Sequence, residues 1–323
     1  MTGRLMWLLL AVFSSAAWSQ TQLKVKMFPG AQALPVLAAV SEGIFARHGL
    51  RVEVLFTVNS EEQRNGLAAG EFQIAQAAVD NAVAMVELAK HDVVIVTGGD
   101  SSMNELIVQP DITSYAQLRG QTVLVDAPNT AYALQLKKIL LMNGLKEGAD
   151  YTLNPIGGTA QRLKGMRENK AFKAAMLNPP FLIDAKASGL KSMGSAVDLI
   201  GPYQATGTFV LRSWGIANAD TLERYIAGFI EGNRWAVAPA NKDAAIKILS
   251  ERLKVTPEVA ARTWEILSDP KRGLARDGRF DMPGFANVLA LRAEIEGSWG
   301  GKAPDGGRYV DLGYYERALL RVK

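Results

Sequence analysis

The chain has no cysteine, and only two of its 323 residues are histidine. The missing thiols exclude disulfide bonds, thiolate nucleophiles, cysteine metal ligands and a lipid anchor on an N-terminal cysteine. Two separate histidines, His48 and His91, are too few for a multi-histidine metal site, and we expect both to be structural. The sequence therefore predicts neither a cofactor nor a metal.

The usual enzyme motifs are also missing. The chain has no phosphate-binding P-loop, no dinucleotide glycine fingerprint and no His-Glu-x-x-His pair. Gly99-Asp100-Ser101 is similar to the nucleophile turn of a lipase, but no histidine follows His91 to complete a triad. These absences argue against an enzyme.

No apolar run reaches the roughly 20 residues that a membrane-spanning helix needs. The run Leu5–Phe13 is short, follows Arg4 and precedes the small-residue segment Ala17-Trp18-Ser19, a pattern typical of an export signal. We expect residues 1–19 to be a signal peptide cleaved near Ser19. The mature protein is then expected in the periplasm and not embedded in the membrane.

Neither sign of charge dominates the surface. Lys and Arg number 36 against 32 Asp and Glu, and the resulting net charge of +4 is spread thinly. The densest basic group, Lys271, Arg272 and Arg276, has Asp269 and Asp277 beside it, which favours a solvated surface over nucleic-acid binding. With 48% apolar residues, a chain of this length predicts about two domains with a sizeable core.

Strands and helices alternate along both halves of the chain. Leu23–Phe28 and Leu50–Phe56 have the two-residue period of strands, and an apolar-periodic helix is expected between them from about 32 to 47. Such a βαβ unit favours a parallel sheet. A helix end, a tight turn and a buried strand occur at Leu67–Gln76 and again, more loosely, at Leu163–Met176.

The repeated pattern predicts two α/β lobes. The glycine- and serine-rich stretch 98–102 is a natural boundary, and the segment from Thr206 to Leu211 is expected to return to the first lobe. We therefore expect lobe 1 to contain residues 20–103 and 206–323, and lobe 2 to contain 104–205. Two hinge crossings lie near residues 103 and 205, and the helices after Asp220 are expected to brace lobe 1.

A family resemblance rests on the leader and on three segments, Gly43–Val54, Leu67–Phe72 and Leu118–Val125. Together they resemble the sulfonate, nitrate, taurine and thiamine-pyrimidine family of bacterial extracytoplasmic solute-binding proteins of ABC transporters. The resemblance implies a type II-like periplasmic-binding-protein fold, whose two lobes close over a small-molecule ligand, and an inner-membrane ABC permease as partner. A monomer is expected. A fungal branch of this family makes a thiamine precursor with a cysteine-rich motif, which this chain lacks.

Ligands of open α/β sheets bind beyond the carboxyl ends of the strands, where helices begin and present free N–H groups. The candidate ligand-binding residues all lie at such positions or at the second crossing. They are Phe28, Gly30, Ala31, Asn59, Ser60, Asp80, Asn81, Asn129, Thr130, Ala131, Tyr132, Gly158, Asn178 and Tyr203.

Individual roles follow from residue type. Asn129 and Thr130 either hold an anion at a helix start or cap their own helix, and the residues alone do not separate the two. Asp80 is expected to cap its helix rather than to recognise an amine, and Asn178 before two prolines is expected to be a cap. Asp126 is expected only to order its loop. The candidate loops contain no arginine, which argues against a guanidinium clamp.

Aromatic side chains near the candidate loops could also contact a ligand. Phe28, Tyr132, Phe181 and Tyr203 offer planar surfaces to a flat ligand, with Tyr203 the best placed because it lies at a crossing. We therefore predict the periplasmic substrate-binding component of an ABC importer, which captures a small anionic or aromatic organic solute. The alternatives are a periplasmic enzyme of the same fold and a solute sensor that docks on a histidine-kinase ectodomain.

Overall fold

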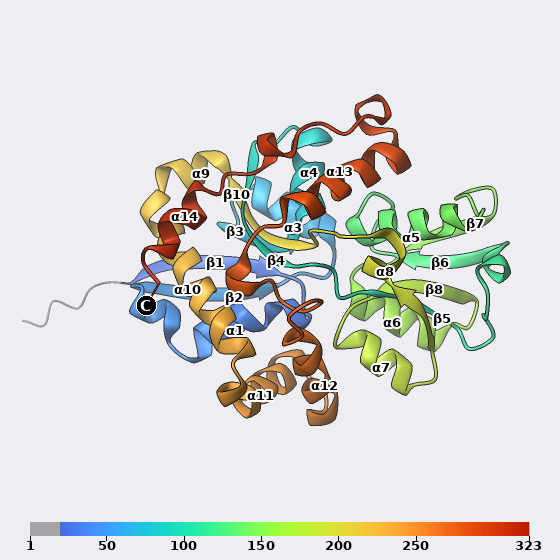
Figure 1. Cartoon of the computed structure of the whole chain (residues 1–323), viewed down its shortest axis with the longest axis horizontal. Helices are drawn as coiled ribbons and strands as arrows, with labels where there is room; N and C mark the ends of the chain where they lie inside the picture. Colours follow the sequence, from blue (N-terminus) through green and yellow to red (C-terminus); the bar gives the residue numbers. More distant parts are fainter. Residues whose placement is uncertain (1–19, 323) are drawn as a thin grey trace, which may run out of the picture.

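The structure, a computed structural model, describes residues 20–322 and contains two β-sheets, each flanked by helices (Figure 1). We refer to the sheet that contains β1, with its helices, as lobe 1, and to the sheet that contains β6, with its helices, as lobe 2. The predicted signal peptide lies outside the described residues. The predicted α/β fold with two lobes is confirmed, while the exact lobe boundaries at 103/104 and 205/206 stay a prediction.

The lobe 1 sheet has the strand order β2-β1-β3-β10-β4. β1 pairs in parallel with β2 and β3, whereas β10 is antiparallel to both β3 and β4. Thus the strand that enters from the other lobe is inserted as the fourth of five. The strands are β1 (Thr21–Met27), β2 (Leu50–Phe56), β3 (Ile74–Ala78), β4 (Val93–Asp100) and β10 (Thr206–Leu211).

The lobe 2 sheet repeats this plan with the order β7-β6-β8-β5-β9. β6 is parallel to β7 and β8, and β5, which arrives from lobe 1, is antiparallel to β8 and β9. Each lobe therefore receives the crossing strand at the same place in its sheet. The strands are β5 (Glu105–Val108), β6 (Gln121–Val125), β7 (Tyr151–Pro155), β8 (Phe172–Leu177) and β9 (Lys191–Ser195).

Helices cover the sheets of both lobes. Those before β10 are α1 (Leu34–Ser41), α2 (Ile44–Arg47), α3 (Ser60–Ala68), α4 (Val79–Glu87), α5 (Ala131–Met142), α6 (Thr159–Glu168), α7 (Phe181–Ala187) and α8 (Ala196–Ile200). Those after it are α9 (Arg212–Ala217), α10 (Ala219–Val237), α11 (Lys242–Leu253), α12 (Pro257–Leu267), α13 (Met282–Glu296) and α14 (Gly313–Leu319). Short 3-10 turns are η1 (Ala31–Ala33), η2 (Tyr115–Leu118), η3 (Pro239–Asn241), η4 (Arg276–Gly278), η5 (Ser298–Gly301) and η6 (Gly306–Tyr309).

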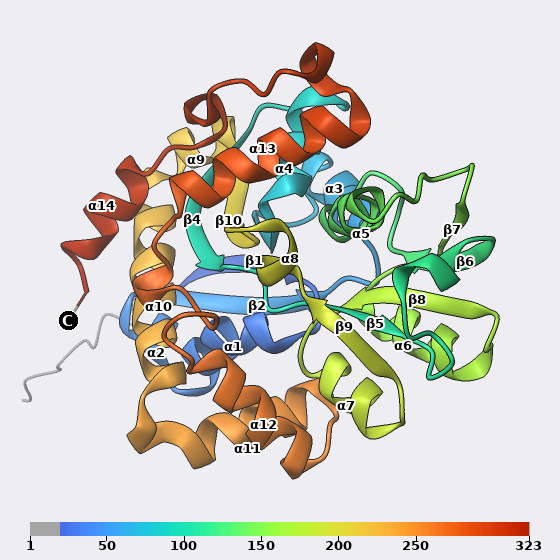
Figure 2. The same ribbon diagram turned by 45° about the vertical axis from the view of Figure 1, so that its right-hand side comes forward.

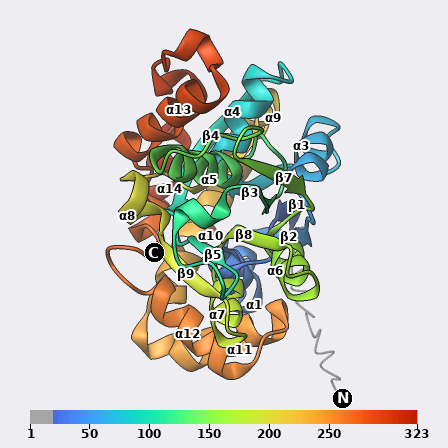
Figure 3. The ribbon, with the colours of Figure 1, turned by 90° about the vertical axis from the view of Figure 1, so that its right-hand side faces the viewer.

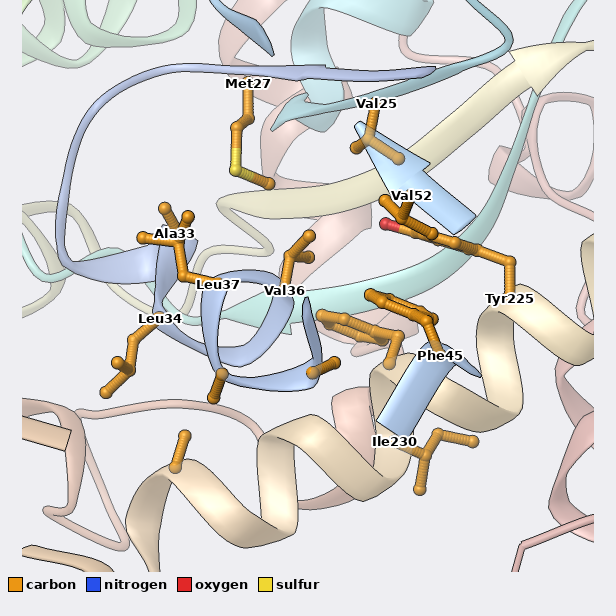
Figure 4. Packing of buried hydrophobic residues seen from close by; sticks show 14 of the residues in the cluster. Val25, Met27, Ala33, Leu34, Val36, Leu37, Phe45, Val52, Tyr225 and Ile230 are labelled. Carbon is orange, nitrogen blue, oxygen red and sulfur yellow. The ribbon is translucent and has the colours of Figure 1, made fainter. Parts of the chain in front are cut away.

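The main core of lobe 1 lies between the sheet, α1 and α10 (Figure 4). Val25 and Met27 point from β1 toward Leu37 of α1, and all three are buried. The rings of Phe45 and Tyr225 stack with centroids 5.2 Å apart and planes 8° from parallel. Truncating a buried aromatic side chain of this kind to alanine costs about 3–5 kcal/mol, so this cluster anchors the first strands on α10.

The predicted single helix from about 32 to 47 is wrong. It is divided into η1, α1 and α2, with a break at Gly43, whose φ of 66° is left-handed. A helix cannot continue through that conformation, which glycine adopts at little cost. The break turns α2 so that the buried Phe45 reaches α10.

The C-terminal helices do more than brace lobe 1, which corrects the prediction. α13 packs on α5 of lobe 2, and α12 lies beside α7 of lobe 2 (Figures 2 and 3). Lys138 of α5 forms an ion pair with Glu294, with Nζ 2.6 Å from Oε1, and Lys137 pairs with Glu296 at 2.9 Å. α13 thus connects the lobes non-covalently, in addition to the two chain crossings.

Between residues 20 and 322, no helix has the length and apolar character needed to cross a membrane.

Candidate functional site

A cavity of about 60 Å³ lies between the two sheets. Most of its lining residues lie at or beyond the carboxyl ends of parallel strands in both lobes, as expected for open α/β sheets, whereas Thr206 begins the antiparallel strand β10. Lobe 1 contributes Phe28, Gln32, Thr57, Ser60, Asn81 and Thr206. Lobe 2 contributes Asp126, Thr130, Tyr132, Thr159, Arg162 and Asn178.

Hydrogen bonds join the lobes around the cavity. The amide of Gly158 donates to the carbonyl of Val58 at 2.8 Å, and the amide of Ala31 donates to the carbonyl of Pro179 at 2.9 Å. Asn178 Nδ2 donates to Gln32 Oε1 at 3.0 Å. At Gly158 a Cβ atom would lie 3.1 Å from the Val58 carbonyl oxygen, so a larger residue would crowd this contact between the lobes. The structure is therefore a closed arrangement of the two lobes.

Asp126 reaches across the cleft from the end of β6 to the start of α3. Its Oδ2 accepts a hydrogen bond from the Ser60 amide at 3.1 Å and another from the Ser60 hydroxyl. The predicted role of Asp126 as a loop-ordering residue is thus incomplete, because its carboxylate holds the first residue of a helix in the other lobe. Asn59 caps that helix by accepting from the amide of Glu62 at 2.8 Å.

Asn81, in the first turn of α4, is 2% exposed and lines the cavity beside Ser60 and Asp126. Its Nδ2 donates to Ser60 Oγ at 3.3 Å, whereas its Oδ1 accepts no hydrogen bond from any residue between 20 and 322. A buried acceptor without a partner costs about 1–3 kcal/mol. Asn81 is therefore a cavity-lining residue whose buried Oδ1 has no donor among the described residues.

Arg162 of α6 is 2% exposed and lines the cavity. Its guanidinium donates to Gly157 O (2.7 Å), Thr159 Oγ1 (3.0 Å) and twice to Met176 O (3.3 and 3.1 Å). Among the described residues no carboxylate forms an ion pair with it. Burial lowers its pKa, an effect that the negative charge of Asp126 opposes, yet a guanidinium stays protonated at neutral pH.

The candidate loops contain no arginine, as the sequence shows, but Arg162 reaches the cavity from within α6, a position that loop residues alone do not reveal. Arg162 lies one turn into α6, and its side chain returns to the helix start, as long helical side chains do. There it lies over the ring of Tyr132, with Cζ 5.6 Å from the ring centroid. The cavity thus contains a buried cation that the loop sequences did not indicate.

The expectation for Asp80 is also wrong. The side chain neither caps α4 nor faces the cavity, because Ala78 is the N-cap residue and the carboxylate is paired with Arg292 of α13. Arg292 Nη2 also donates to the carbonyl of Asn129 in lobe 2 at 2.9 Å.

The cap predicted for Asn178 is wrong as well, since Pro180 is the N-cap residue of α7 and the Asn178 amide bonds to Gln32.

The candidate residues divide into two groups by position. The cavity is lined by Phe28, Ser60, Asn81, Thr130, Ala131, Tyr132, Gly158 and Asn178. Gly30, Ala31, Asn59, Asp80, Asn129 and Tyr203 are not among its lining residues. Tyr203 is 1% exposed and packs in the core around Phe209 instead, so a crossing position did not bring it to the cavity. Thr130 is the N-cap residue of α5, but its hydroxyl donates to the Ala127 carbonyl rather than accepting from the helix.

The histidines lie elsewhere. His48 Nε2 is 2.9 Å from Glu231 Oε1, and neither His48 nor His91 lines the cavity. Within residues 20–322 no group of three or more His, Cys, Asp or Glu side chains has the arrangement of a metal site.

Comparison with known proteins supports the resemblance inferred from the sequence. The NMT1/THI5-like family model matches residues 31–169. A protein of Brachyspira hyodysenteriae, whose assigned role is that of an ABC transporter periplasmic binding protein, is 22% identical over 235 residues. The alignment covers 68% of this chain and 66% of the relative, just under two thirds of its length.

Solved structures share the fold over nearly the whole chain. The periplasmic nitrate-binding protein of Synechocystis PCC 6803 has a TM-score of 0.77 at 14% identity, with 94% of this chain and 89% of that chain covered. The alkanesulfonate-binding protein of Xanthomonas axonopodis pv. citri, bound to MOPS, has a TM-score of 0.72 at 15% identity, with coverage of 91% and 99%. The predicted resemblance and fold class are confirmed, and these neighbours are ligand-binding proteins.

Proposed function

We propose that this protein is the periplasmic substrate-binding component of an ABC importer, which captures a small organic solute in the cavity between its lobes. The observation that carries the proposal is Arg162, a buried guanidinium at the cavity wall with no carboxylate ion-paired to it among the described residues. Buried charges in proteins are normally paired, so an anionic group on a bound solute would supply the missing partner.

The walls support an organic solute rather than a bare ion. Phe28 and Tyr132 line the cavity with their rings, and Ala77, Ala78 and Ala131 add further apolar surface. A solute with an anionic group and a small apolar or aromatic part fits these walls. Lobes held together by a few hydrogen bonds and by the ion pairs between α5 and α13 also suit a cycle of opening and closing, in which a monomer presents its closed form to an inner-membrane permease.

A thermal-shift screen of the mature protein tests this function. The compounds are sulfonates, carboxylates, pyrimidines and polyamines, and we expect an anionic or aromatic compound to raise the unfolding temperature. Small-angle scattering with and without that compound should then show a change in lobe closure. Stabilisation by polyamines alone would contradict the ligand class.

Two results would replace the proposal itself. Turnover of a bound compound by the purified protein would indicate a periplasmic enzyme. Solute-dependent binding to a histidine-kinase ectodomain, with no effect on uptake when the protein is deleted, would indicate a sensor.

A further inference from the structure

Helix α12 belongs to lobe 1 by its packing. Ala260, Trp264 and Leu267 are buried in the main core of that lobe. Trp264 Nε1 donates to the carbonyl of Ala236 in α10 at 2.9 Å, and α12 also packs on α11. When the lobes separate, we therefore expect α12 to stay with lobe 1.

The same helix covers part of lobe 2 (Figure 2). Ile266 packs against the main core of lobe 1 and also against a core of lobe 2 that contains Leu182 and Ile183 of α7. Val259, seven residues before Ile266 and on the same face of α12, packs against that lobe 2 core as well. We call this contact between Val259 and Ile266 of α12 and Leu182 and Ile183 of α7 the flank seam.

The flank seam is separate from the cavity but moves with it. None of its four residues lines the cavity. However, α7 begins three residues after Asn178, whose side chain does line the cavity. The carbonyl of Pro179 accepts from the Ala31 amide of η1, and η1 in turn contacts α12. Opening of the cavity therefore also separates α7 from α12.

This separation has an energetic consequence. In the closed arrangement Leu182 and Ile183 are 2% and 7% exposed, and opening would bring their apolar side chains into water. Removal of apolar surface from water is favourable in proportion to the area removed. The flank seam thus favours the closed form whatever the cavity contains.

A charged residue interrupts the apolar face of α12 at the flank seam. Val259, Arg262 and Ile266 have the i, i+3, i+7 spacing of a single helix face, and Arg262 is exposed. A groove of about 430 Å³ remains beside the contact, lined by Arg262, Ile266, Leu182 and Ile183. The arginine therefore limits the apolar area that closure buries.

We infer that the flank seam controls lobe closure from outside the binding cavity. Ile266 draws the lobes together through α7, and Arg262 keeps this attraction weak enough for the lobes to open. The two residues thereby set the open-to-closed ratio, and with it the solute affinity, without touching the solute. The inference goes beyond the proposed function, because an enzyme or a sensor with the same two lobes would be under the same control.

Spin labels test it without any solute. The chain has no cysteine, so Asn65→Cys on α3 and Lys164→Cys on α6 place one label on each lobe. Both positions are exposed, and both helices begin beside the hydrogen bond between Val58 and Gly158, where the lobes meet. Double electron–electron resonance on the mature protein then gives the distribution of label distances, which are longer in the open form.

Two seam variants should shift this distribution in opposite directions. We expect Ile266→Ser to raise the open-to-closed ratio about tenfold, equivalent to about 1.4 kcal/mol, because closure no longer buries an apolar side chain there. Arg262→Leu should lower the ratio about threefold, because it completes the apolar face of α12 against α7. Damage to the fold would not produce this second shift.

Ile246→Ser is the matched control. Ile246 of α11 is a partly buried isoleucine that packs against the main core of lobe 1 and not against the lobe 2 core. This variant should lose stability in urea denaturation but keep the wild-type label distances. If neither Ile266→Ser nor Arg262→Leu shifts the ratio, or if Ile246→Ser shifts it as much as Ile266→Ser does, the inference is overturned.

A compound that raises the unfolding temperature in the thermal-shift screen extends the test to affinity. Its dissociation constant should rise in Ile266→Ser in proportion to the closed fraction that is lost. If the variants shift the label distances but no compound binds, the flank seam stands and the receptor function is wrong. If a compound binds and closes the lobes but neither seam variant shifts the ratio, the receptor function stands and the seam inference is wrong.

Discussion

Arg292 and Asp80 form a bidentate ion pair in the interior, with Nε 2.8 Å from Oδ1 and Nη2 2.7 Å from Oδ2. Their side chains are 1% and 0% exposed. The pair joins α13, near the end of the chain, to α4, which begins beside the cavity. Through Asn129 O the same guanidinium also contacts lobe 2.

Breaking this pair should destabilise the protein strongly. Arg292→Met leaves the Asp80 carboxylate buried without its partner, and we expect a loss of about 3–5 kcal/mol in the free energy of unfolding. Urea denaturation measures it. Arg317→Met is the matched control, because Arg317 is 53% exposed in its pair with Glu223 and should cost under about 1 kcal/mol. Equal losses of unfolding free energy in the two variants would show that the buried pair stabilises the protein no more than an exposed pair does.

Arg162 should be required for anion binding. We expect Arg162→Gln to weaken the affinity for an anionic compound from the screen by at least about thirtyfold, about 2 kcal/mol, because a buried charge pair is lost. Titration calorimetry gives the value. Arg167→Gln on the same helix, whose side chain is 38% exposed in a pair with Asp184, should bind normally. Retained affinity in Arg162→Gln would remove this residue from the site.

The ion pairs between α5 and α13 should favour the closed form. In the double variant Glu294→Gln/Glu296→Gln, loss of the attraction to Lys138 and Lys137 should shift the lobes toward the open form by about 0.3–1 kcal/mol. Small-angle scattering at low salt should detect the larger radius of gyration. The wild type at about 1 M salt, where such charges are screened, should approach the variant. Glu168→Gln, which breaks an exposed pair with Lys164 within α6, is the control and should leave closure unchanged.

Glu62 should make stability depend on pH in the acidic range. A hydrogen bond from Lys26, opposed by burial and helped by the Val58 amide and Thr57, lowers the pKa of Glu62 to about 2 from 4.5. Because the folded-state pKa is depressed, the stabilisation is complete above about pH 4.5 and is lost as the pH falls toward 2.

The test is the pH dependence of urea denaturation. We expect Glu62→Gln to be less stable than the wild type at neutral pH and the difference to shrink below pH 4.5. Solvent screening keeps the effect small, since the Glu62 side chain is 41% exposed. The exposed Glu61→Gln is the control for loss of a carboxylate. A difference that stays constant between pH 7 and 3 would contradict the prediction.

The fold was predictable because its signals are local. The buried strand expected at the end of Leu163–Met176 is β8, and the segment from Thr206 to Leu211 that was expected to return to lobe 1 is β10. The break at Gly43 was missed because apolar residues continue on both sides of it. The order of strands in the sheets could not be predicted from local sequence. It depends on which strands β5 and β10 pair with after the chain crosses between the lobes, and both are the fourth strand of their sheet.

The site was only partly predictable for a related reason. Helix starts after strands identified Ser60, Asn81 and Thr130 as cavity positions, because chain direction alone brings them to one edge. Arg162 was not predicted as a cavity residue because its guanidinium lies at the start of α6, one turn away from its own backbone. Asp80 was misjudged because its partner, Arg292, is 212 residues away, and no local pattern reveals such a pair.

Thr206 belongs to three structures at once. It begins β10, it lines the cavity, and its hydroxyl donates to Asp100 at the end of β4, where burial raises the pKa of the carboxyl. The ends of β4 and β10, the strands by which the chain leaves and re-enters lobe 1, are therefore hydrogen-bonded to each other at the cavity wall. If the cavity binds the solute as proposed, we expect the solute to contact this junction directly, without a distant helix between them.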